Sequence, residues 1–511
     1  MSARKSTLVD EQILLGQSRS LVDVANYLGD TGLDLSGLSG IEVTEITSST
    51  GAVIPGSLFV AHRGIRSHGA HYIHAAIEAG AIAFLTDREG EEIIRTAGAG
   101  DLPVLVVSRP EVDLGHLAHW FHGHPMRNMH AVGVTGTNGK STITTLLYEL
   151  WEKAGYVSGL MGTIATVMPG LSVSAVRTTE SADEIARVTA QMARLHVRTL
   201  AMEVSSHGLA LDRLNGARFA AVAFSNLSQD HLDFHGDMAS YFAAKSTLFT
   251  HEFSDRAFIN IDDPYGAKLA EATKLETVTV SLADRHAAWS VVARESLPTG
   301  NRLSIRGPGG ILIESQIPLI GTHNVENYLL ALALAVDSGV DPLVIAEISR
   351  HLKGAPGRLE RIDLGQPFMA YVDYAHTPDA VSRVLRSLRE SVPGRVIALL
   401  GCGGDRDRSK RPLMGKALSD GADVAIFTSD NPRSEDPSQI LAEMTAGIDV
   451  NEPSLVEVDR RSAIERAVSI AKEGDVVILL GKGHERGQEF DGWMEEFDDR
   501  LELAKAIEGR R

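Results

Sequence analysis

The stretch Val132-Gly-Val-Thr-Gly-Thr-Asn-Gly-Lys-Ser-Thr142 decides the fold of the middle of this chain. The apolar run at 131–134 predicts a buried strand, and residues 141–151, with three leucines on one face, predict a helix. The glycine-rich turn between them brings backbone N–H groups together beside a helix N-terminus, which carries partial positive charge. The stretch therefore predicts a loop that binds the phosphates of a nucleoside triphosphate.

Single residues in this loop have separate roles. Lys140 adds a full positive charge, and Ser141 offers a hydroxyl group that can bind magnesium. The general phosphate-loop pattern has a glycine where this chain has Val134, so the loop here is the shorter Gly136-x-x-Gly139-Lys140-Ser141. A chance glycine-rich turn is the alternative, but a strand before the loop and a helix after it favour the phosphate-binding interpretation.

Length and composition limit the class of protein. The 511 residues suggest about three domains of ~150 residues each, and contents of 43% hydrophobic and 23% charged residues are ordinary for a globular protein. A net charge of −18 argues against a nucleic-acid partner. The single cysteine, Cys402, is typical of a reducing cytoplasm. We expect neither a secretory signal nor a membrane span, which needs about 20 apolar residues.

Strand-like and helix-like segments alternate along the whole chain and predict an α/β fold in three domains, 1–125, 126–352 and 353–511. The first domain reads as a small α/β binding domain, with predicted strands at 56–61, 81–86 and 102–108 and a helix at 71–79. The stretch Gly354-Ala-Pro-Gly357-Arg358 predicts the linker before the third domain.

Three polar clusters follow the phosphate loop. Thr178-Thr179-Glu180 lies in a polar connection, 201–208 follows a predicted strand at 197–200, and 226–236 follows a predicted strand at 220–224. Ligands of open α/β sheets collect at the carboxyl ends of the strands. Each cluster alone can be a polar loop or a helix cap, but the three together favour one shared site.

Within these clusters Glu203 and His231 are candidate magnesium partners. Magnesium prefers oxygen ligands, so the carboxylate is suitable, whereas hydrogen-bonding support explains His231 equally well. Lys245 lies among apolar residues of a helix predicted at 240–249, and its spacing alone favours a lysine that extends to the surface. Asn324 precedes a long apolar helix predicted at 328–336 and can either cap it or contact a ligand.

The third domain repeats one pattern of strand, polar turn and helix. This repetition predicts a parallel sheet with right-handed crossovers and one ligand-binding edge. Arginines and aspartates around the glycine-rich turns favour a charged small-molecule site over plain tight turns. The predicted strands are 368–372, 396–400, 424–428 and 476–480, and their turns are 373–379, 401–412, 429–433 and 481–485.

The order of these motifs resembles the Mur ligase family, and within it the tripeptide synthetases that add the third residue of the peptidoglycan stem. The motifs that carry the resemblance are Thr135-Gly-Thr-Asn-Gly-Lys-Ser141, Met202-Glu-Val-Ser-Ser-His207, Asn226-Leu-Ser-Gln-Asp-His-Leu-Asp233, Asp373-Tyr-Ala-His-Thr-Pro378 and Asp430-Asn-Pro-Arg433.

The resemblance implies an ATP-dependent amide ligase of cell-wall synthesis. A carboxylate of UDP-N-acetylmuramoyl-L-alanyl-D-glutamate attacks the γ-phosphate of ATP, and an amine of the incoming diamino acid, meso-2,6-diaminopimelate, then attacks the acyl phosphate. It also implies a UDP-binding N-terminal domain, a P-loop ATPase-like central domain and a Rossmann-like C-terminal domain. It further implies Mg²⁺ as the cofactor and ATP as a co-substrate, and we expect a cytoplasmic monomer.

The resemblance assigns roles to individual residues. Lys140, Glu203, His231 and Lys245 are catalytic, and Lys245 is carbamylated by CO₂, which replaces the surface interpretation above. The metal site is Ser141, Glu203, His231 and carbamylated Lys245. The ATP site is Gly136, Thr137, Asn138, Gly139, Lys140, Ser141, Thr142, Asn324, Arg358 and Asp373. The UDP-muramoyl site is Thr50, Thr178, Thr179, Ser205 and Arg213. The amino-acid site is Arg406, Asp430, Asn431, Pro432, Arg433, Gly481 and Glu485.

The first domain departs from the family pattern. Where the family has Asp-Ser-Arg, this chain has Ser49-Thr50-Gly51, so only a hydroxyl group remains for a uridine contact. The loop at 65–67 is also unusual, and Leu211 stands where the family often has a glutamine.

Several alternatives remain open. L-Lysine or another diamino acid can replace diaminopimelate, although it offers Arg433 no second carboxylate. A P-loop ATPase motor or assembly factor would leave the third domain without a role. A non-catalytic binding protein would not need Lys140, Glu203, His231 and Lys245. A folylpolyglutamate-type ligase shares the scaffold and the lysine chemistry but lacks the motif at 430–433 and the long first domain.

Overall fold

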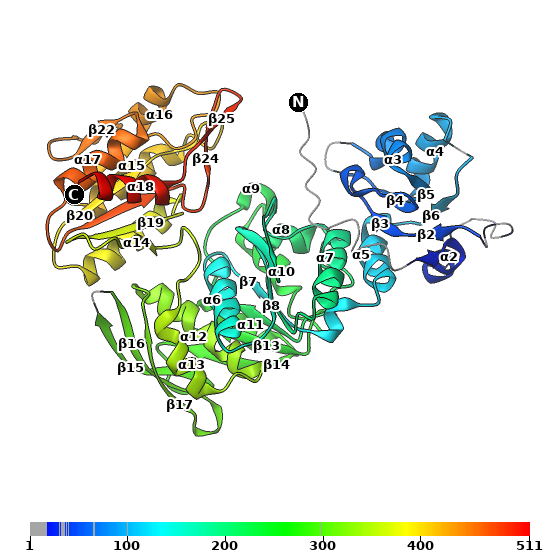
Figure 1. Cartoon of the computed structure of the whole chain (residues 1–511), viewed down its shortest axis with the longest axis horizontal. Helices are drawn as coiled ribbons and strands as arrows, with labels where there is room; N and C mark the ends of the chain where they lie inside the picture. Colours follow the sequence, from blue (N-terminus) through cyan, green and yellow to red (C-terminus); the bar gives the residue numbers. More distant parts are fainter. Residues whose placement is uncertain are drawn as a thin grey trace. The chain divides into compact units, whose positions relative to one another are not determined.

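The computed structural model of the chain describes residues 18–29, 31, 36, 38, 40–64, 67–99, 101–297 and 299–510 (Figure 1). The described chain forms two compact units. The first comprises the described residues up to 280 together with 333–340, and the second comprises the described residues of 281–332 and 341–510. None of the helices in the described ranges combines the length and the apolar character needed to cross a membrane.

The N-terminal part of the first unit is a parallel sheet in the order β3-β4-β5-β6. Alternate residues of its strands pack on opposite faces, as period-2 side chains must. Leu58 and Leu85 face helices α2 and α5, while Phe59 and Phe84 face α3 and α4. The elements are β1 Arg19–Ser20, α2 Leu21–Leu28, β2 Glu42–Val43, β3 Glu45–Thr47, η1 Thr50–Ala52, β4 Ser57–Ala61, η2 Gly69–Tyr72, α3 Ile73–Ala79, β5 Ala81–Thr86, α4 Arg88–Thr96, β6 Val104–Val106, α5 Pro110–Phe121 and η3 Pro125–Asn128.

A second sheet of this unit has the order β10-β9-β8-β11-β7-β12-β13-β14. Strands β8, β11, β7, β12, β13 and β14 are parallel, and β9 and β10 extend the sheet as antiparallel strands. The carboxyl ends of β7, β11 and β12 therefore lie along one edge, as the polar clusters predicted. The elements are β7 His130–Thr135, α6 Lys140–Lys153, β8 Ser158–Met161, β9 Ala165–Met168, β10 Leu171–Ser174, α7 Ala182–Arg194, β11 Thr199–Glu203, α8 Ser206–Ala210, β12 Ala221–Phe224, α9 Leu232–His235, α10 Met238–Ser246, β13 Arg256–Asn260, α11 Pro264–Ala272 and β14 Glu276–Ser281.

The second unit begins with three antiparallel strands, β15 to β17. Helix α12 starts at Thr322, six residues before its predicted start, so Asn324 lies in its first turn rather than in a preceding loop. Its residues from 333 on belong to the first unit. The elements are β15 Trp289–Leu297, β16 Gly300–Arg306, η4 Pro308–Gly310, β17 Leu312–Ile317, α12 Thr322–Asp337, α13 Pro342–Ile348 and η5 Ser349–His351.

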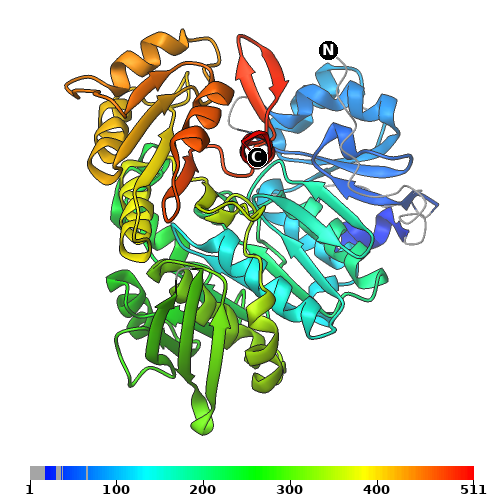
Figure 2. The ribbon, with the colours of Figure 1, turned by 60° about the vertical axis from the view of Figure 1, so that its left-hand side comes forward.

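The C-terminal sheet has the order β18-β19-β23-β20-β21-β22, in which only β18 is antiparallel. Helices α14, α15 and α16 cover one face and α17 and α18 cover the other. Figure 2 shows the β24–β25 hairpin of this unit as an orange-red two-stranded ribbon. The elements are β18 Glu360–Arg361, β19 Met369–Asp373, α14 Pro378–Ser391, β20 Val396–Leu400, α15 Lys410–Gly421, β21 Val424–Thr428, α16 Pro437–Met444, β22 Leu455–Glu457, α17 Arg460–Ile470, β23 Val476–Leu480, β24 Gly487–Phe490, β25 Trp493–Glu496 and α18 Asp499–Gly509.

Two predicted elements differ from the structure in ways that matter for the site. Strand β11 ends at Glu203, whereas the predicted strand ended at 200. The Glu203 carboxylate therefore belongs to the last residue of a strand. The predicted helix at 240–249 is α10, which begins at Met238 and ends at Ser246, just after Lys245. The domain boundaries after residues 125 and 352 stay a prediction.

Candidate functional site

The phosphate loop connects β7 to α6 and is held in place by the segment that follows β12. The Thr137 N–H donates to the Asn226 carbonyl at 2.8 Å, and the Asn138 N–H donates to the Asn226 side-chain oxygen at 3.0 Å. Gly136 has φ +149, and a Cβ there would lie 1.9 Å from Ser225 Oγ. Only glycine fits at that position, so the loop shape depends on it.

Two lysines converge on one oxygen of this loop. Lys140 Nζ donates to the Gly136 carbonyl at 3.0 Å and to the Thr137 carbonyl at 2.9 Å, and Lys245 Nζ donates to the Gly136 carbonyl at 2.8 Å. Lys245 is 1% exposed and forms no ion pair with the described residues. Burial, reinforced by the charge of Lys140, holds the pKa of Lys245 well below its usual range. The deep position of Lys245 contradicts the surface interpretation drawn from its spacing.

Ser141 and Glu203 meet beside the loop. Ser141 Oγ donates to Glu203 Oε2 at 3.0 Å, and Thr163 donates its hydroxyl to Oε2 at 2.9 Å and its N–H to Oε1 at 2.8 Å. The Thr178 hydroxyl lies 3.0 Å from Thr163 Oγ1, which can accept its proton while the Thr163 hydroxyl donates to Glu203. Glu203 is 2% exposed, so these donors satisfy a carboxylate that burial would otherwise penalise.

The residues predicted for the UDP-muramoyl substrate join the same network. Thr179 Oγ1 donates to the Glu203 carbonyl at 3.0 Å and accepts the Ser205 N–H at 2.9 Å. Arg213 Nη1 donates to the Thr179 carbonyl at 2.9 Å, and burial followed by the charge of Arg177 lowers its pKa. The structure thus brings four of the five predicted residues of this group, Thr178, Thr179, Ser205 and Arg213, beside Glu203.

Thr50, the fifth residue of that group, lies in η1 of the N-terminal sheet region and is half-buried. The segment before it is fixed to α7, because Thr47 Oγ1 and the Ser48 N–H donate to Asp183 Oδ2 at 3.0 and 2.8 Å. Residues 65 and 66 of the unusual loop lie outside the described residues.

His231 belongs to a cluster of rings. Its ring centroid lies 4.8 Å from that of His207 and 6.3 Å from that of Tyr241. Burial lowers the pKa of His231, and His207, Lys140 and Lys245 lower it further against the opposing effect of Asp230. A neutral imidazole is the form that can bind a metal ion or accept a hydrogen bond.

The three remaining residues predicted for ATP lie in the second unit. Asn324 Nδ2 donates to the Ile320 carbonyl at 3.0 Å. Asp373 accepts the N–H groups of Leu359 and Ala375, both at 2.7 Å, and burial raises its pKa despite the nearby Arg358. The Arg358 guanidinium lies 4.4 Å from the ring centre of Tyr374. Their part in nucleotide binding stays a prediction.

Asn431 and Glu485 meet at the carboxyl edge of the C-terminal sheet. Asn431 Nδ2 donates to Glu485 Oε2 at 2.8 Å. The buried Lys482 Nζ donates to Asn431 Oδ1 at 3.1 Å and to Glu485 Oε2 at 3.3 Å. Lys482 therefore fixes both predicted amino-acid contacts.

The other predicted amino-acid residues surround these two. Arg433, which follows Pro432, has φ +53 and donates through Nη1 to the Gly404 carbonyl at 2.7 Å. Gly481 lies against Asp430, since a Cβ there would be 2.7 Å from Asp430 Oδ2. Arg406 is exposed and makes no hydrogen bond or ion pair within the described residues. An exposed guanidinium of this kind is available to a substrate carboxylate.

The metal candidates form an unusual set of ligands. Among the residues that the structure describes, no three or more His, Cys, Asp or Glu side chains are arranged to hold a metal ion. The predicted set has only Glu203 and His231 of those types, so it depends on Ser141 and on modification of Lys245. Magnesium needs only one or two protein oxygens because it keeps several waters, and the paired Ser141 and Glu203 fit that requirement.

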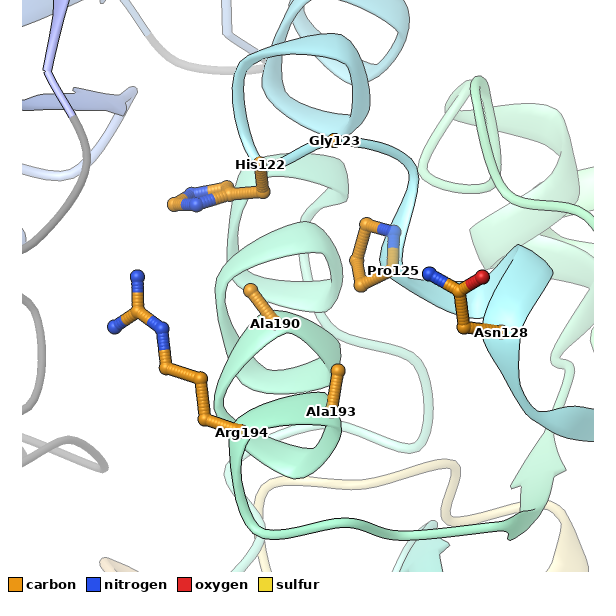
Figure 3. A pocket seen from close by; sticks show the side chains of 7 residues that line it. All are labelled: His122, Gly123, Pro125, Asn128, Ala190, Ala193 and Arg194. Carbon is orange, nitrogen blue, oxygen red and sulfur yellow. The ribbon is translucent and has the colours of Figure 1, made fainter.

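A separate groove of about 230 Å³ lies between residues 122–128 and the last turns of α7 (Figure 3). His122, Asn128 and Arg194 are its polar lining residues. None of the residues predicted for the nucleotide, the metal or the substrates lines it. We therefore do not assign the reaction to this groove.

Sequence reasoning missed three residues of the site. Thr163 binds both oxygens of Glu203, Lys482 joins Asn431 to Glu485, and Glu489 Oε2 accepts the Arg433 Nε–H at 2.9 Å. Lys482 lies in a glycine-rich turn after a predicted strand, and that position was the only indication of its role. Thr163 and Glu489 are in no recognisable motif.

Family models match most of the chain in three consecutive segments. The model described as Mur ligase family, catalytic domain, matches residues 42–122. The Mur ligase middle domain matches residues 134–335, and the model described as Mur ligase, glutamate ligase domain, matches residues 357–483.

Known proteins resemble the chain over nearly its whole length. A UDP-N-acetylmuramoyl-L-alanyl-D-glutamate–2,6-diaminopimelate ligase of Streptomyces coelicolor is 43% identical over 95% of this chain and 96% of its own. The ligase of the same name from Streptomyces avermitilis is 44% identical over 91% of this chain and 93% of its own. A solved structure of a ligase of that name is 31% identical, with a TM-score of 0.70 over 96% of this chain and 99% of that chain.

Proposed function

The chain belongs to the Mur ligase family, and on this premise we propose that it is the ATP-dependent ligase that joins meso-2,6-diaminopimelate to UDP-N-acetylmuramoyl-L-alanyl-D-glutamate in peptidoglycan synthesis. The D-glutamate carboxylate attacks the γ-phosphorus of ATP, which forms an acyl phosphate and releases ADP. A neutral amine of diaminopimelate then attacks the acyl carbon, an amide bond forms, and inorganic phosphate leaves.

The convergence of groups on the phosphate loop carries this proposal. Lys140 and Lys245 both donate to the Gly136 carbonyl, and the pair of Ser141 and Glu203 adjoins the same loop. Two anions, a carboxylate and a triphosphate, must approach each other in the first step, and the positive charge of Lys140, fixed in advance, lowers the cost of that approach. The ammonium group of Lys140 can stabilise the negative charge that develops on the γ-phosphate during the transfer.

Ser141 and Glu203 are the side chains that would hold Mg²⁺ in this proposal. When bound, the ion supplies charge neutralisation of the phosphate oxygens. Thr163 keeps the Glu203 carboxylate in place through both of its oxygens. His231, neutral because of its lowered pKa, completes the proposed set as a ligand or as a hydrogen-bonding neighbour.

We further propose that Lys245 is carbamylated. Its buried amine has a lowered pKa and lacks an ion-pair partner among the described residues, so the neutral, nucleophilic form is favoured. The amine nitrogen attacks the carbon of CO₂, an N–C bond forms, and a proton passes to water. The product is an anion with two oxygen atoms, which suits a site that contains Lys140 and magnesium.

Recognition of the amino acid is proposed for the pocket around Arg433. A guanidinium can bind the second carboxylate of diaminopimelate in bidentate fashion, whereas L-lysine, the alternative substrate, lacks that group. Asn431 and Glu485, joined by Lys482, would bind the amino end of the same substrate. Binding of L-lysine would leave the Arg433 guanidinium without a carboxylate partner, and this would weaken the binding of L-lysine.

The setting of the reaction is also part of the proposal. We place it in the cytoplasm, in line with a chain whose single cysteine, Cys402, is free, and we propose that the protein acts as a monomer. The partners are then ATP, the UDP-muramoyl dipeptide and the diamino acid. The N-terminal, central and C-terminal domains would bind the UDP-sugar, ATP and the amino acid, respectively.

One experiment tests the function directly. The protein is incubated with ATP, Mg²⁺ and the UDP-muramoyl dipeptide, each candidate amino acid is offered separately, and the products are weighed by mass spectrometry. We expect the tripeptide mass with meso-diaminopimelate and ADP in equal amount. A tripeptide formed only with L-lysine would replace the proposed substrate, and ADP released without any dipeptide would favour an ATPase.

A further inference from the structure

The β24–β25 hairpin is bound along its first strand to the segment 430–433. Gln488 Nε2 donates to the Asp430 carbonyl at 2.6 Å, and the Glu489 N–H donates to Asn431 Oδ1 at 3.1 Å. The Arg433 N–H donates to the Glu489 carbonyl at 2.9 Å. These bonds place the side chains of Glu489 and Arg433 next to each other.

The Arg433 guanidinium is held at two of its nitrogen atoms. Nε donates to Glu489 Oε2 at 2.9 Å, and Nη1 donates to the Gly404 carbonyl at 2.7 Å. Nη2 makes no hydrogen bond with the part of the chain that the structure describes. Because the guanidinium is planar and rigid, two fixed contacts set the direction of all its remaining donors.

The hairpin also holds the backbone of Arg433 in place. Its φ of +53 lies in the left-handed region, which is unfavourable for a side chain of this size. The Asp491 N–H donates to the Arg433 carbonyl at 2.7 Å, so the hairpin holds Arg433 on both sides of its Cα atom. The strained conformation thus depends on the hairpin rather than on the local sequence.

We propose that Glu489 is a specificity-determining positioning residue for the amino-acid substrate. By accepting the Nε–H it orients the guanidinium so that the donors of Nη2 are left for the far carboxylate of a diaminodicarboxylic acid. This inference rests on the proposed function, in which Arg433 binds that carboxylate. Glu489 therefore acts on the substrate through Arg433.

Partial exposure indicates which property of Glu489 matters. The side chains of Arg433 and Glu489 are 21% and 39% exposed, so water screens much of their ionic attraction. The contact therefore matters more for the orientation of the Arg433 guanidinium than for the stability of the fold. A glutamine can accept the same Nε–H through its side-chain oxygen, whereas an alanine cannot.

The test compares Glu489→Ala and Glu489→Gln with the wild type in steady-state assays of tripeptide formation. We expect Glu489→Ala to raise the KM for diaminopimelate about tenfold, the loss expected for one charge-assisted hydrogen bond. The KM values for ATP and for the UDP-muramoyl dipeptide, and kcat, should stay within about twofold of the wild type, since the contact acts on binding. Glu489→Gln should recover most of the affinity for diaminopimelate.

Glu496→Ala is the matched control, because Glu496 is an exposed glutamate of the same hairpin and its side chain makes no hydrogen bond or ion pair within the described residues. An unchanged KM for diaminopimelate in Glu489→Ala, or an equal rise for all three substrates, would overturn the assignment. Failure of the proposed function is distinguishable, since the wild type itself would then form no tripeptide with diaminopimelate.

Discussion

Lys140 and Lys245 bring two amino groups to the carbonyl oxygen of Gly136, at 3.0 and 2.8 Å. Like charges at this spacing repel, and burial adds to the cost of a charged Lys245. The arrangement lowers the pKa of Lys245 and leaves Lys140 as the cation of the loop. A site built in this way favours an anion at the place where the two amines meet.

Substitution of Lys140 tests the phosphate loop. Lys140→Ala should lower the rate of ADP release about 10²- to 10³-fold, because a positive group positioned for the transferred phosphate is lost. The measurement is a coupled ADP assay with all substrates present. Lys153→Ala, an exposed lysine at the other end of α6, is the control and should keep normal turnover. Normal turnover in Lys140→Ala would remove that residue from the mechanism.

Substitution of Lys245 tests the carbamate. Lys245→Ala should lower kcat about 100-fold, because the anionic oxygen ligands formed from the lysine are lost. Formate or acetate added to the assay should restore part of the activity, since a small carboxylate can enter the space that the side chain leaves. Full activity without added carboxylate, or an inactive variant that no carboxylate rescues, would argue against carbamylation.

Substitution of Arg433 tests the choice of amino acid. Arg433→Ala should raise the KM for diaminopimelate about 10- to 100-fold, because a bidentate, charge-assisted contact is removed. The KM for ATP should change little. Steady-state kinetics with each substrate varied in turn provides both values. If the KM for diaminopimelate stayed the same, another residue would have to select the amino acid.

At the scale of elements, one buried ion pair holds the edge of the C-terminal sheet together. Arg460, at the start of α17, donates to Asp499, at the start of α18, at 2.6 Å, and both side chains are fully buried. The same guanidinium donates to the carbonyls of Ser429 and Leu480, both at 3.1 Å. The Ser429 carbonyl lies at the start of the turn at 429–433, and the Leu480 carbonyl directly precedes the turn at 481–485. The pair therefore fixes the two segments that form the proposed amino-acid pocket.

Loss of this pair should therefore destabilise the C-terminal domain. Asp499→Ala should lower its free energy of unfolding by about 3–5 kcal/mol, because it leaves a buried arginine without its anion. Denaturant unfolding monitored by circular dichroism measures the change. The control Asp420→Ala removes an exposed partner of Lys416 and should cost about 0–1 kcal/mol. Equal effects of the two substitutions would contradict the role of burial.

At the scale of the whole molecule, buried histidine makes stability depend on pH. His119 in α5 is 1% exposed, and burial, followed by the nearby His122, lowers its pKa to about 3. An unfolded chain binds a proton at this side chain below about pH 6.5, whereas the folded chain stays neutral. The contribution of His119 to stability is therefore full above pH 6.5 and falls as the pH decreases toward 3.

Stability should decrease by about 1.4 kcal/mol per pH unit from this group alone between pH 6 and 4. Denaturant midpoints recorded across that range for the wild type and for His119→Gln provide the test, and the variant should show the shallower dependence. His74→Gln changes an exposed histidine of the same domain and serves as the control. Parallel pH profiles for wild type and His119→Gln would contradict the prediction.

Much of the fold was predictable because it depends on local patterns. The strands predicted at 396–400, 424–428 and 476–480 are β20, β21 and β23 with the same bounds. Each is a continuous apolar run between polar turns, which is what a strand buried on both faces requires. The antiparallel strands β9, β10 and β15 to β17 were missed, since half-exposed strands carry polar residues and lack such runs.

The sequence by itself determined the phosphate loop, the three polar clusters after it and the sheet edge of the third domain, because each of these consists of short runs of consecutive residues. Only the tertiary structure decided which side chains meet there. Thr163 is hydrogen-bonded to Glu203, 40 residues away in the sequence, and Glu489 is hydrogen-bonded to Arg433, 56 residues away. Lys245, which local spacing placed at the surface, is buried against a loop 109 residues earlier in the chain. Such contacts depend on strand order and on hairpin pairing, since neighbours in a sheet are rarely neighbours in the chain.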